Sequence, residues 1–248
     1  MFPLGRIKFN VLLRNLLLLQ QVFCSIYAIA QNGEQNWLKQ NSYDRSVSVF
    51  DANGRAFTNR NWDIAGSAFF LDEWKYGSLK LNNNKEYGQL KLRLNLQNNE
   101  VHFISTNNVE MAVNKGLIKE ITLSDSIKAA TYTFQCGFPA IDQQDQNSFY
   151  LLLADGKIKF IKSIRKIISE DKDLISGEIK KEFITYEDYY FFFLNILQRI
   201  RKDRNYMLGI MGDKNDKIEN FVKVNKLSYK SVDDIKKIVD YYNSISPN

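Results

Sequence analysis

The only histidine of this 248-residue chain, His102, is the residue type best suited to general acid–base catalysis or metal binding. It lies between Val101 and Phe103, in a segment whose pattern predicts a β-strand. The sequence has no G-x-S-x-G motif to supply a nucleophile, and no C-x-x-C or H-E-x-x-H motif for a metal. We therefore predict a histidine that lies on the sheet surface or half-buried. No catalytic or metal-binding residue is assigned.

Carboxylates are the second source of possible chemistry, because glycosidases use two of them in a facing pair. Five acids fall in the region predicted to form strands: Asp63, Asp72, Glu73, Glu100 and Glu110. Nothing in the sequence marks two of them as neighbours. Asp213 to Asp216 has some features of a calcium loop, but its lysines and misplaced distal glutamate fit a helix start better. Neither a G-x-G-x-x-G motif nor a P-loop is present, so we predict no cofactor.

Two groups of aromatic residues suit binding better than catalysis. The first lies between Gly66 and Gly77, and the second, in the C-terminal third, comprises Tyr186–Phe193 and Tyr241-Tyr242. If they are exposed, such residues form a contact surface for a partner; if they are buried, they close the core. The candidate partner-contact residues are Phe69, Phe70, Trp74, Tyr76, Tyr241 and Tyr242.

The elements that position these residues are predicted to be β-strands. From about Val47 to Phe193, apolar residues recur mainly at every second position, which is the pattern of strands. In the clearest strand, leucines at positions 90, 92, 94 and 96 alternate with polar residues, and Val101–Ile104 can return beside it as a hairpin. Further strands are predicted at Gly77–Leu81, Val109–Val113, Leu117–Leu123, Ala129–Cys136, Ser148–Leu153 and Lys157–Ile164. The dense aromatic run Tyr186–Leu194 predicts a final strand covered on both faces.

The period changes after Asn195, where Ile196, Ile200, Met207 and Ile210 have helix-compatible spacing. A second helix is predicted within Asp216–Asn225. A last one should follow Ser231-Val232-Asp233-Asp234, which resembles a capping box and precedes the apolar stripe Ile235, Ile238, Val239 and Tyr242.

The predicted fold is therefore α+β and β-dominated: an antiparallel sandwich, a curved sheet or an incomplete barrel, followed by two or three helices. We expect a β domain over residues 31–194 with a loose N-terminal arm, and a helical segment over residues 195–248 that packs on it.

Residues 1–30 predict a signal peptide that is removed from the working protein. Arg6, Lys8 and Arg14 precede an apolar run that ends in Ala28-Ile29-Ala30, a pattern that favours cleavage after Ala30. The apolar run supplies about 15 residues, fewer than the roughly 20 of a membrane-spanning helix. We therefore expect an exported protein in the periplasm or, alternatively, outside the cell, with no transmembrane segment after cleavage.

Cleavage also changes the charge and the cysteine content. Without its three basic leader residues, the net charge falls from +6 to +3, too weak a bias to predict nucleic-acid binding. Cys24 leaves with the leader, so no disulfide within the chain is expected. Phe134, Cys136 and Phe138 alternate on one face, which predicts a buried structural thiol.

Three segments of the chain stand out together: Gly66–Trp74; Leu92–Glu100 with its continuation to Phe103; and Asn225–Ser228, which leads into Ile238 and Tyr241-Tyr242-Asn243. With these segments the chain resembles a group of exported proteins of Bacteroidota envelopes. The resemblance implies an exported protein with strands followed by helices. The group has no established activity, so it implies no catalytic residue.

The sequence leaves three functions open. The first is a non-catalytic periplasmic protein that binds an envelope protein, as an accessory subunit of an outer-membrane transport or secretion assembly. The alternative is a carrier that holds a lipid or other apolar ligand in a cavity lined by residues such as Leu90, Leu92, Phe103 and Phe134. The third is a hydrolase with an unrecognised site. The oligomeric state is not predicted.

Overall fold

The computed structural model describes residues 64–114, 116–172, 174–175 and 177–246, all within one compact unit. The predicted signal peptide, its cleavage site after Ala30, the N-terminal arm and Asp63 lie outside the described residues.

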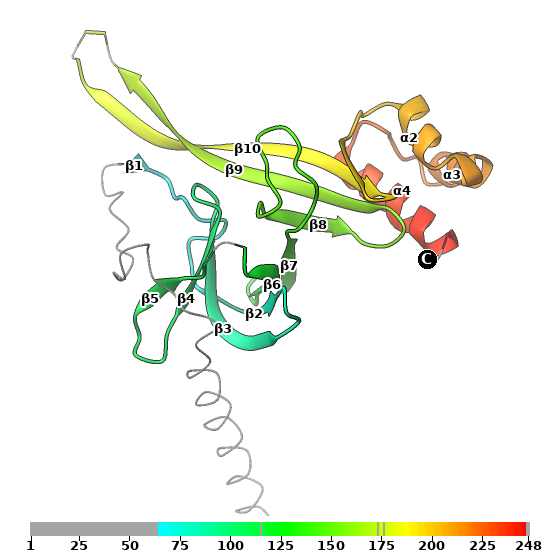
Figure 1. Cartoon of the computed structure of the whole chain (residues 1–248). Helices are drawn as coiled ribbons and strands as arrows, with labels where there is room; N and C mark the ends of the chain where they lie inside the picture. Colours follow the sequence, from blue (N-terminus) through cyan, green and yellow to red (C-terminus); the bar gives the residue numbers. More distant parts are fainter. Residues whose placement is uncertain (1–63, 115, 173, 176, 247–248) are drawn as a thin grey trace, which may run out of the picture. The chain divides into compact units, whose positions relative to one another are not determined.

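The described strands form one open, mixed, mostly antiparallel sheet of eleven strands (Figure 1). They are β1 (Ile64–Ala65), β2 (Lys75–Leu81), β3 (Glu86–Asn95), β4 (Glu100–Ile104), β5 (Glu110–Ala112), β6 (Ile118–Asp125), β7 (Ala130–Gln135), β8 (Tyr150–Ala154), β9 (Lys159–Lys172), β10 (Ile179–Phe193) and β11 (Ile196–Arg199). The order is β1-β10-β9-β8-β7-β6-β2-β3-β4-β5, with β11 also on β10. Among the described strands, only β1 forms a parallel pair, with β10. The predicted β-dominated α+β class is confirmed, in the form of an open sheet.

The alternating leucines of β3 pack as predicted. Leu92 and Leu94 are fully buried, and Leu96 just after the strand is also buried. On β2, Gly77 allows a close approach to β6, because a Cβ there would lie 1.9 Å from the carbonyl oxygen of Thr122. A larger residue at position 77 would push these two strands apart.

Three α-helices follow the sheet: α2 (Arg204–Ile210), α3 (Asn215–Val224) and α4 (Val232–Ile245), with a short 3₁₀ turn at Gly212–Lys214. The predicted cap of the last helix is confirmed, because the Ser231 side chain accepts a hydrogen bond from the backbone N–H of Asp234. The apolar stripe of α4 packs with Phe160 of β9 and Phe191 of β10 in one buried cluster.

The sequence predicted helical structure from Ile196, but Ile196–Arg199 forms strand β11, so this prediction is wrong. For the same reason, Tyr186–Leu194 does not contain the final strand of the sheet. Leu194 and Asn195 have positive φ values of 47° and 61°, the backbone conformation of a tight hairpin turn. This turn reverses the chain, so that β11 pairs with Tyr190–Phe193 of β10.

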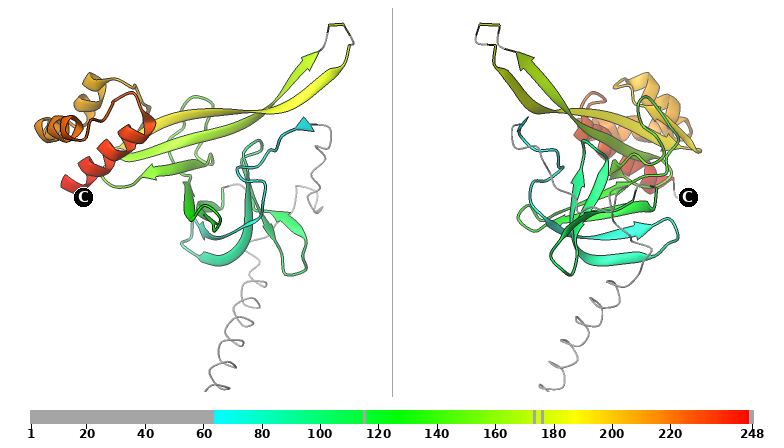
Figure 2. Two further views of the ribbon diagram at one scale, coloured as in Figure 1. Left: turned by 180° about the vertical axis from the view of Figure 1, so that it is seen from behind. Right: turned by 60° about the vertical axis from the view of Figure 1, so that its left-hand side comes forward.

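The hairpin of β9 and β10 is paired over fourteen positions, and its strands are longer than the sequence pattern predicted. Its neighbour β8 runs beside β9 only as far as Ser163. We call residues 159–163 and 188–193 the base of the hairpin, and residues 164–187 the arm. Figures 1 and 2 show the arm continuing as a two-stranded ribbon beyond β8.

Candidate functional site

A buried ionic cluster forms where β3, β4 and β5 lie side by side. His102 is fully buried, and its Nδ1 lies 2.7 Å from Oε1 of Glu110. The same Glu110 oxygen accepts a hydrogen bond from Nη2 of Arg93 at 2.9 Å. Glu100 lies on the other side of the ring, with its Oε2 3.8 Å from Nε2 of His102. The sheet register thus brings the candidate acid Glu110 of β5 to the histidine, while the candidate acid Glu100 lies two positions before His102 on the same face of β4.

The prediction of a surface or half-buried His102 is wrong, because aromatic side chains lie over this part of the sheet. The Phe69 ring meets the histidine edge-to-face, with 5.3 Å between ring centroids. The Arg93 guanidinium lies 3.9 Å from the centroid of Phe69 and 4.1 Å from that of Trp74. Two of the predicted partner-contact residues therefore stack on an arginine of this cluster.

Burial and hydrogen bonding act in opposite directions on the two titratable partners. Burial alone would lower the pKa of His102, but the neighbouring carboxylates of Glu100 and Glu110 outweigh it and raise the pKa above its ordinary value. Burial alone would raise the pKa of Glu110, but the bonds from His102 and Arg93 lower it. Both shifts favour the charged pair, so the cluster joins three neighbouring strands by charge-assisted hydrogen bonds.

The other candidate acids that the structure describes, Asp72 and Glu73, do not join this cluster. Asp72 and Glu73 are exposed in the segment before β2, and Glu73 pairs with Nζ of Lys75 at 2.7 Å. In the part of the chain that the structure describes, no group of three or more His, Cys, Asp or Glu side chains is placed to hold a metal ion.

The six predicted partner-contact residues differ in exposure. Phe69 and Tyr242 are buried in the core. Phe70 packs edge-to-face on Phe134 and Tyr132, and Tyr241 stacks on Phe221 at 4.0 Å between centroids. Tyr76 is 55% exposed. Phe69 and Tyr242 therefore offer no free surface, and a role in binding stays a prediction.

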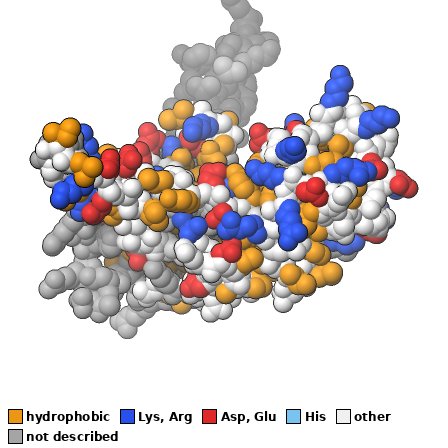
Figure 3. Space-filling view, turned by 90° about the horizontal axis from the view of Figure 1, so that it is seen from above, with side chains coloured by type: hydrophobic (Ala, Val, Ile, Leu, Met, Phe, Trp, Pro, Cys, Tyr) orange, Lys and Arg blue, Asp and Glu red, His pale blue; other side chains and the backbone are white. Residues whose placement is uncertain are grey.

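Among the described residues, the two most exposed large apolar side chains lie on the arm, which the sequence analysis did not single out. Leu174 and Ile175 at its turn are 94% and 99% exposed, and Ile167, Ile179 and Tyr186 along its strands are each about half exposed. Figure 3 shows hydrophobic side chains at the end of the arm, beside acidic and basic ones. We call Ile167, Leu174, Ile175, Ile179 and Tyr186 the arm surface. The sequence does contain a feature that could have predicted this exposure, namely two adjacent apolar residues, Leu174 and Ile175, within the otherwise polar segment Asp171–Glu178.

An ionic network at the junction of base and arm fixes the arm's direction. Arg165 of β9 and Arg199 of β11 both bind Asp188 of β10, at 3.1 and 3.0 Å. Arg199 also binds Asp142 at 2.9 Å, and the Tyr190 hydroxyl donates to the same carboxylate at 2.8 Å. Strands β9, β10 and β11 and the segment that contains Asp142 thus meet where the arm begins.

The other side of the arm is held by the segment before β2. The Nζ of Lys166 donates to the carbonyl oxygens of Ser67 and Phe69, at 2.7 Å each. Beyond this contact, β1 pairs with Lys181 and Glu182 of the arm. The arm therefore projects as a hairpin that is supported at Lys166 and, further along, by β1.

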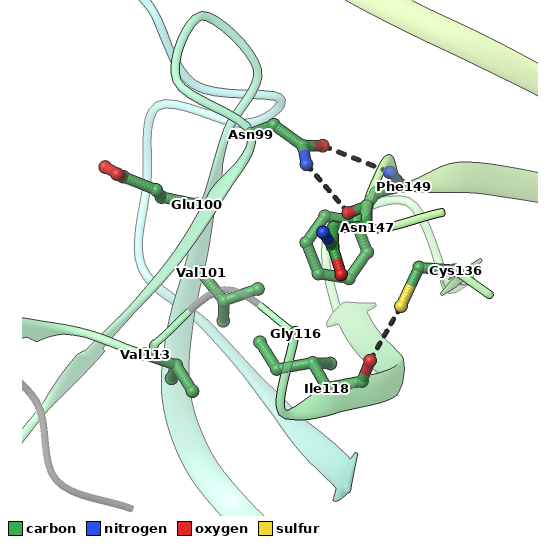
Figure 4. Close-up of a pocket in the computed structure, with 9 residues that line it drawn as sticks. All are labelled: Asn99, Glu100, Val101, Val113, Gly116, Ile118, Cys136, Asn147 and Phe149. Carbon is green, nitrogen blue, oxygen red and sulfur yellow. Dashed lines mark hydrogen bonds between the residues drawn. The ribbon is translucent and has the colours of Figure 1, made fainter. Parts of the chain in front are cut away.

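A small cavity lies between the β3–β4 turn and the start of β8 (Figure 4). Its volume is about 10 Å³, roughly the space of one water molecule. Asn99 spans one wall: its Nδ2 donates to the carbonyl oxygen of Asn147, and its Oδ1 accepts from the N–H of Phe149. On another wall, the Cys136 thiol donates to the carbonyl oxygen of Ile118 at 2.7 Å, and burial raises its pKa to about 11. Cys136 is a free, partly buried thiol.

The residues predicted to line a ligand cavity lie elsewhere. Leu92 and Phe134 are fully buried, Leu90 and Phe103 are half-buried, and none of the four lines the small cavity. A carrier function stays a prediction.

Comparisons of the chain with protein families, curated proteins and solved structures found no match. Among the described residues, no helix has the length and apolar character needed to cross a membrane. The function is therefore inferred from the contacts and exposure of this chain's own residues.

Proposed function

We propose that this chain is a non-catalytic protein-binding subunit that contacts its partner through the arm surface. The observation that carries the proposal is the exposure of Leu174 and Ile175 at the end of a supported hairpin. Fully burying one such side chain contributes about 1.5–3 kcal/mol, so an exposed pair is a strong contact point for a protein. Together with the predicted export signal, this favours an accessory subunit of an outer-membrane transport or secretion assembly, acting in the periplasm or at the cell exterior.

The proposal is tested by affinity purification of the tagged full chain from gently crosslinked envelope membranes of the cells that produce it. Replacement of both apolar turn residues (Leu174→Ser with Ile175→Ser) should reduce recovery of the partner at least about tenfold, equivalent to about 1.4 kcal/mol of binding free energy. The matched control is Ile127→Ser, because Ile127 is 80% exposed on the β6–β7 turn, away from the arm.

Recovery of a free monomer alone, even after crosslinking, would contradict the proposal. An equal loss of partner in the Ile127→Ser control would also contradict it, because binding would then not depend on the arm.

A further inference from the structure

The arm differs in charge from the rest of the chain. The whole chain carries a net charge of +6, whereas the arm contains six acidic and five basic residues. Its acidic excess lies toward the turn, because segment 169–182 contains five acidic and three basic residues. The acidic residues are Glu170, Asp171, Asp173, Glu178 and Glu182, and the basic residues are Lys172, Lys180 and Lys181. The exposed Leu174-Ile175 pair thus sits in an acidic stretch of a basic protein.

Pairing within the arm leaves this acidic excess beside the apolar turn. Lys181 binds Glu170 across the two strands at 2.8 Å. Lys180 lies directly opposite Asp171 in the strand register. Two of the three lysines therefore face acids of the arm itself, and segment 169–182 as a whole keeps a net charge of −2 in the sequence that flanks Leu174 and Ile175.

This combination determines which surface fits the arm. An anionic membrane attracts basic segments, by about 1 kcal/mol for each Lys or Arg near its surface, and repels acidic ones. A protein pocket with apolar walls and basic residues at its rim complements both features of the arm, its apolar end and its negative sides.

We infer that the arm inserts Leu174 and Ile175 into an apolar pocket of a different protein, and that lysine or arginine residues at the rim of the pocket face the arm's acids. The inference rests on the proposed function and adds the chemistry of the partner's binding site. The apolar pair supplies binding energy, and the acids supply orientation and a faster encounter.

The test places a photo-crosslinking amino acid at position 175 of the full chain, in the cells that produce it. The expected adduct contains one other protein, crosslinked at a segment with apolar residues and at least one Lys or Arg. Carbodiimide, which joins a carboxylate to an amine, should couple Asp171 or Glu178 to a lysine of that same protein. Raising NaCl from about 50 to about 500 mM should lower the adduct yield severalfold, because salt screens exposed charges.

A neutral variant isolates the contribution of charge. Asp171→Asn with Glu178→Gln keeps the apolar pair and removes two acids, so the adduct yield should fall about three- to tenfold. The matched control is Asp72→Asn with Asp216→Asn, which removes two exposed acids outside the arm and should leave the yield unchanged. Circular dichroism and the urea midpoint confirm that each variant is folded.

The possible failures are distinguishable. A protein adduct with unchanged yield in the neutral variant, or with no Lys or Arg near the crosslink, overturns the inference and leaves the proposed function standing. Adducts with lipid alone, accompanied by flotation of the purified chain with phosphatidylglycerol vesicles, overturn both in favour of a membrane surface. Adducts between two copies of this chain overturn the inference in favour of self-association. No adduct at position 175 overturns both.

Discussion

The base and the arm of the β9–β10 hairpin are parts of the same two strands, but they differ in what covers them. At the base, Tyr190 packs with Tyr150 and Ile161 on one face, and Phe191 packs among the C-terminal helices on the other. On the arm, Ile167 and Ile179 are about half exposed, although the ladder between the strands continues without a break.

The difference shows that backbone pairing alone does not decide which part of a hairpin becomes core. Coverage of the base comes from β8, β11 and the helices, all of which end before the arm begins. The base therefore contributes mainly to stability, and the arm leaves apolar side chains available for a partner.

The largest expected effect is at the base. Phe191→Ala removes a fully buried ring from the cluster that joins the sheet to the helices, and should lower the free energy of unfolding by about 3–5 kcal/mol. Urea denaturation measures the change. A loss below about 1 kcal/mol would show that the base is not the stabilising part of the hairpin.

A smaller effect is expected where α4 is fastened to the turn before β9. Asn243 accepts a hydrogen bond from the N–H of Ile158 and donates to the carbonyl oxygens of Asp155 and Ile158. Asn243→Ala leaves these backbone groups without that partner and should cost about 1–3 kcal/mol in the same assay. If the variant is as stable as the wild type, the helices cover the base without this connection.

A further effect is expected at His102, a buried polar side chain that is paired with carboxylates, unlike the exposed apolar side chains of the arm. Since the pKa of His102 is raised in the folded state, its contribution to stability is fully present below the ordinary value of 6.5 and is lost as the pH rises through the raised pKa. Unfolding free energy should therefore fall with rising pH in that window. In His102→Gln this component should be absent, and an unchanged pH profile would show that the histidine does not titrate as inferred.

The smallest effect on stability is expected on the arm. Leu174→Ser with Ile175→Ser should change the free energy of unfolding by no more than about 0.5 kcal/mol, because both side chains are almost fully exposed. The same pair of substitutions should abolish most partner binding. A large loss of stability would instead mean that the turn packs against another part of the chain.

The sequence predicted the features that depend on local pattern. The alternation at Leu92 and Leu94 indicated a strand buried on one face, and Ser231 with Asp234 indicated the start of the last helix. The helix predicted from Ile196 was wrong because a four-residue spacing fits both a helix and a short strand after a tight turn. That turn requires a positive φ at Leu194, a conformation that leucine rarely adopts, so the sequence did not indicate a turn there.

The candidate site depended on tertiary structure and could not be predicted in the same way. Arg93 and Glu110 meet at His102 only because the sheet register sets β3, β4 and β5 side by side. Glu100, by contrast, lies two positions before His102 on the same face of β4. The exposure of the arm depends on where β8 ends, at the level of Ser163. Neither the register of β3, β4 and β5 nor the end of β8 can be predicted from the residues of the site alone.

The strand order also has a consequence for the course of folding. Most neighbours in the sheet are consecutive along the chain, as in β2-β3-β4-β5 and β6-β7-β8-β9-β10, so these pairings close short loops. The pairing of β2 with β6 closes a longer loop. The pairing of β1 with Lys181 and Glu182 closes the longest one among the described strands, because it joins one end of the described chain to a hairpin far along it. We therefore expect β1 to join last, after β9 and β10 have paired. The arm is then complete as a hairpin before its support from β1 forms.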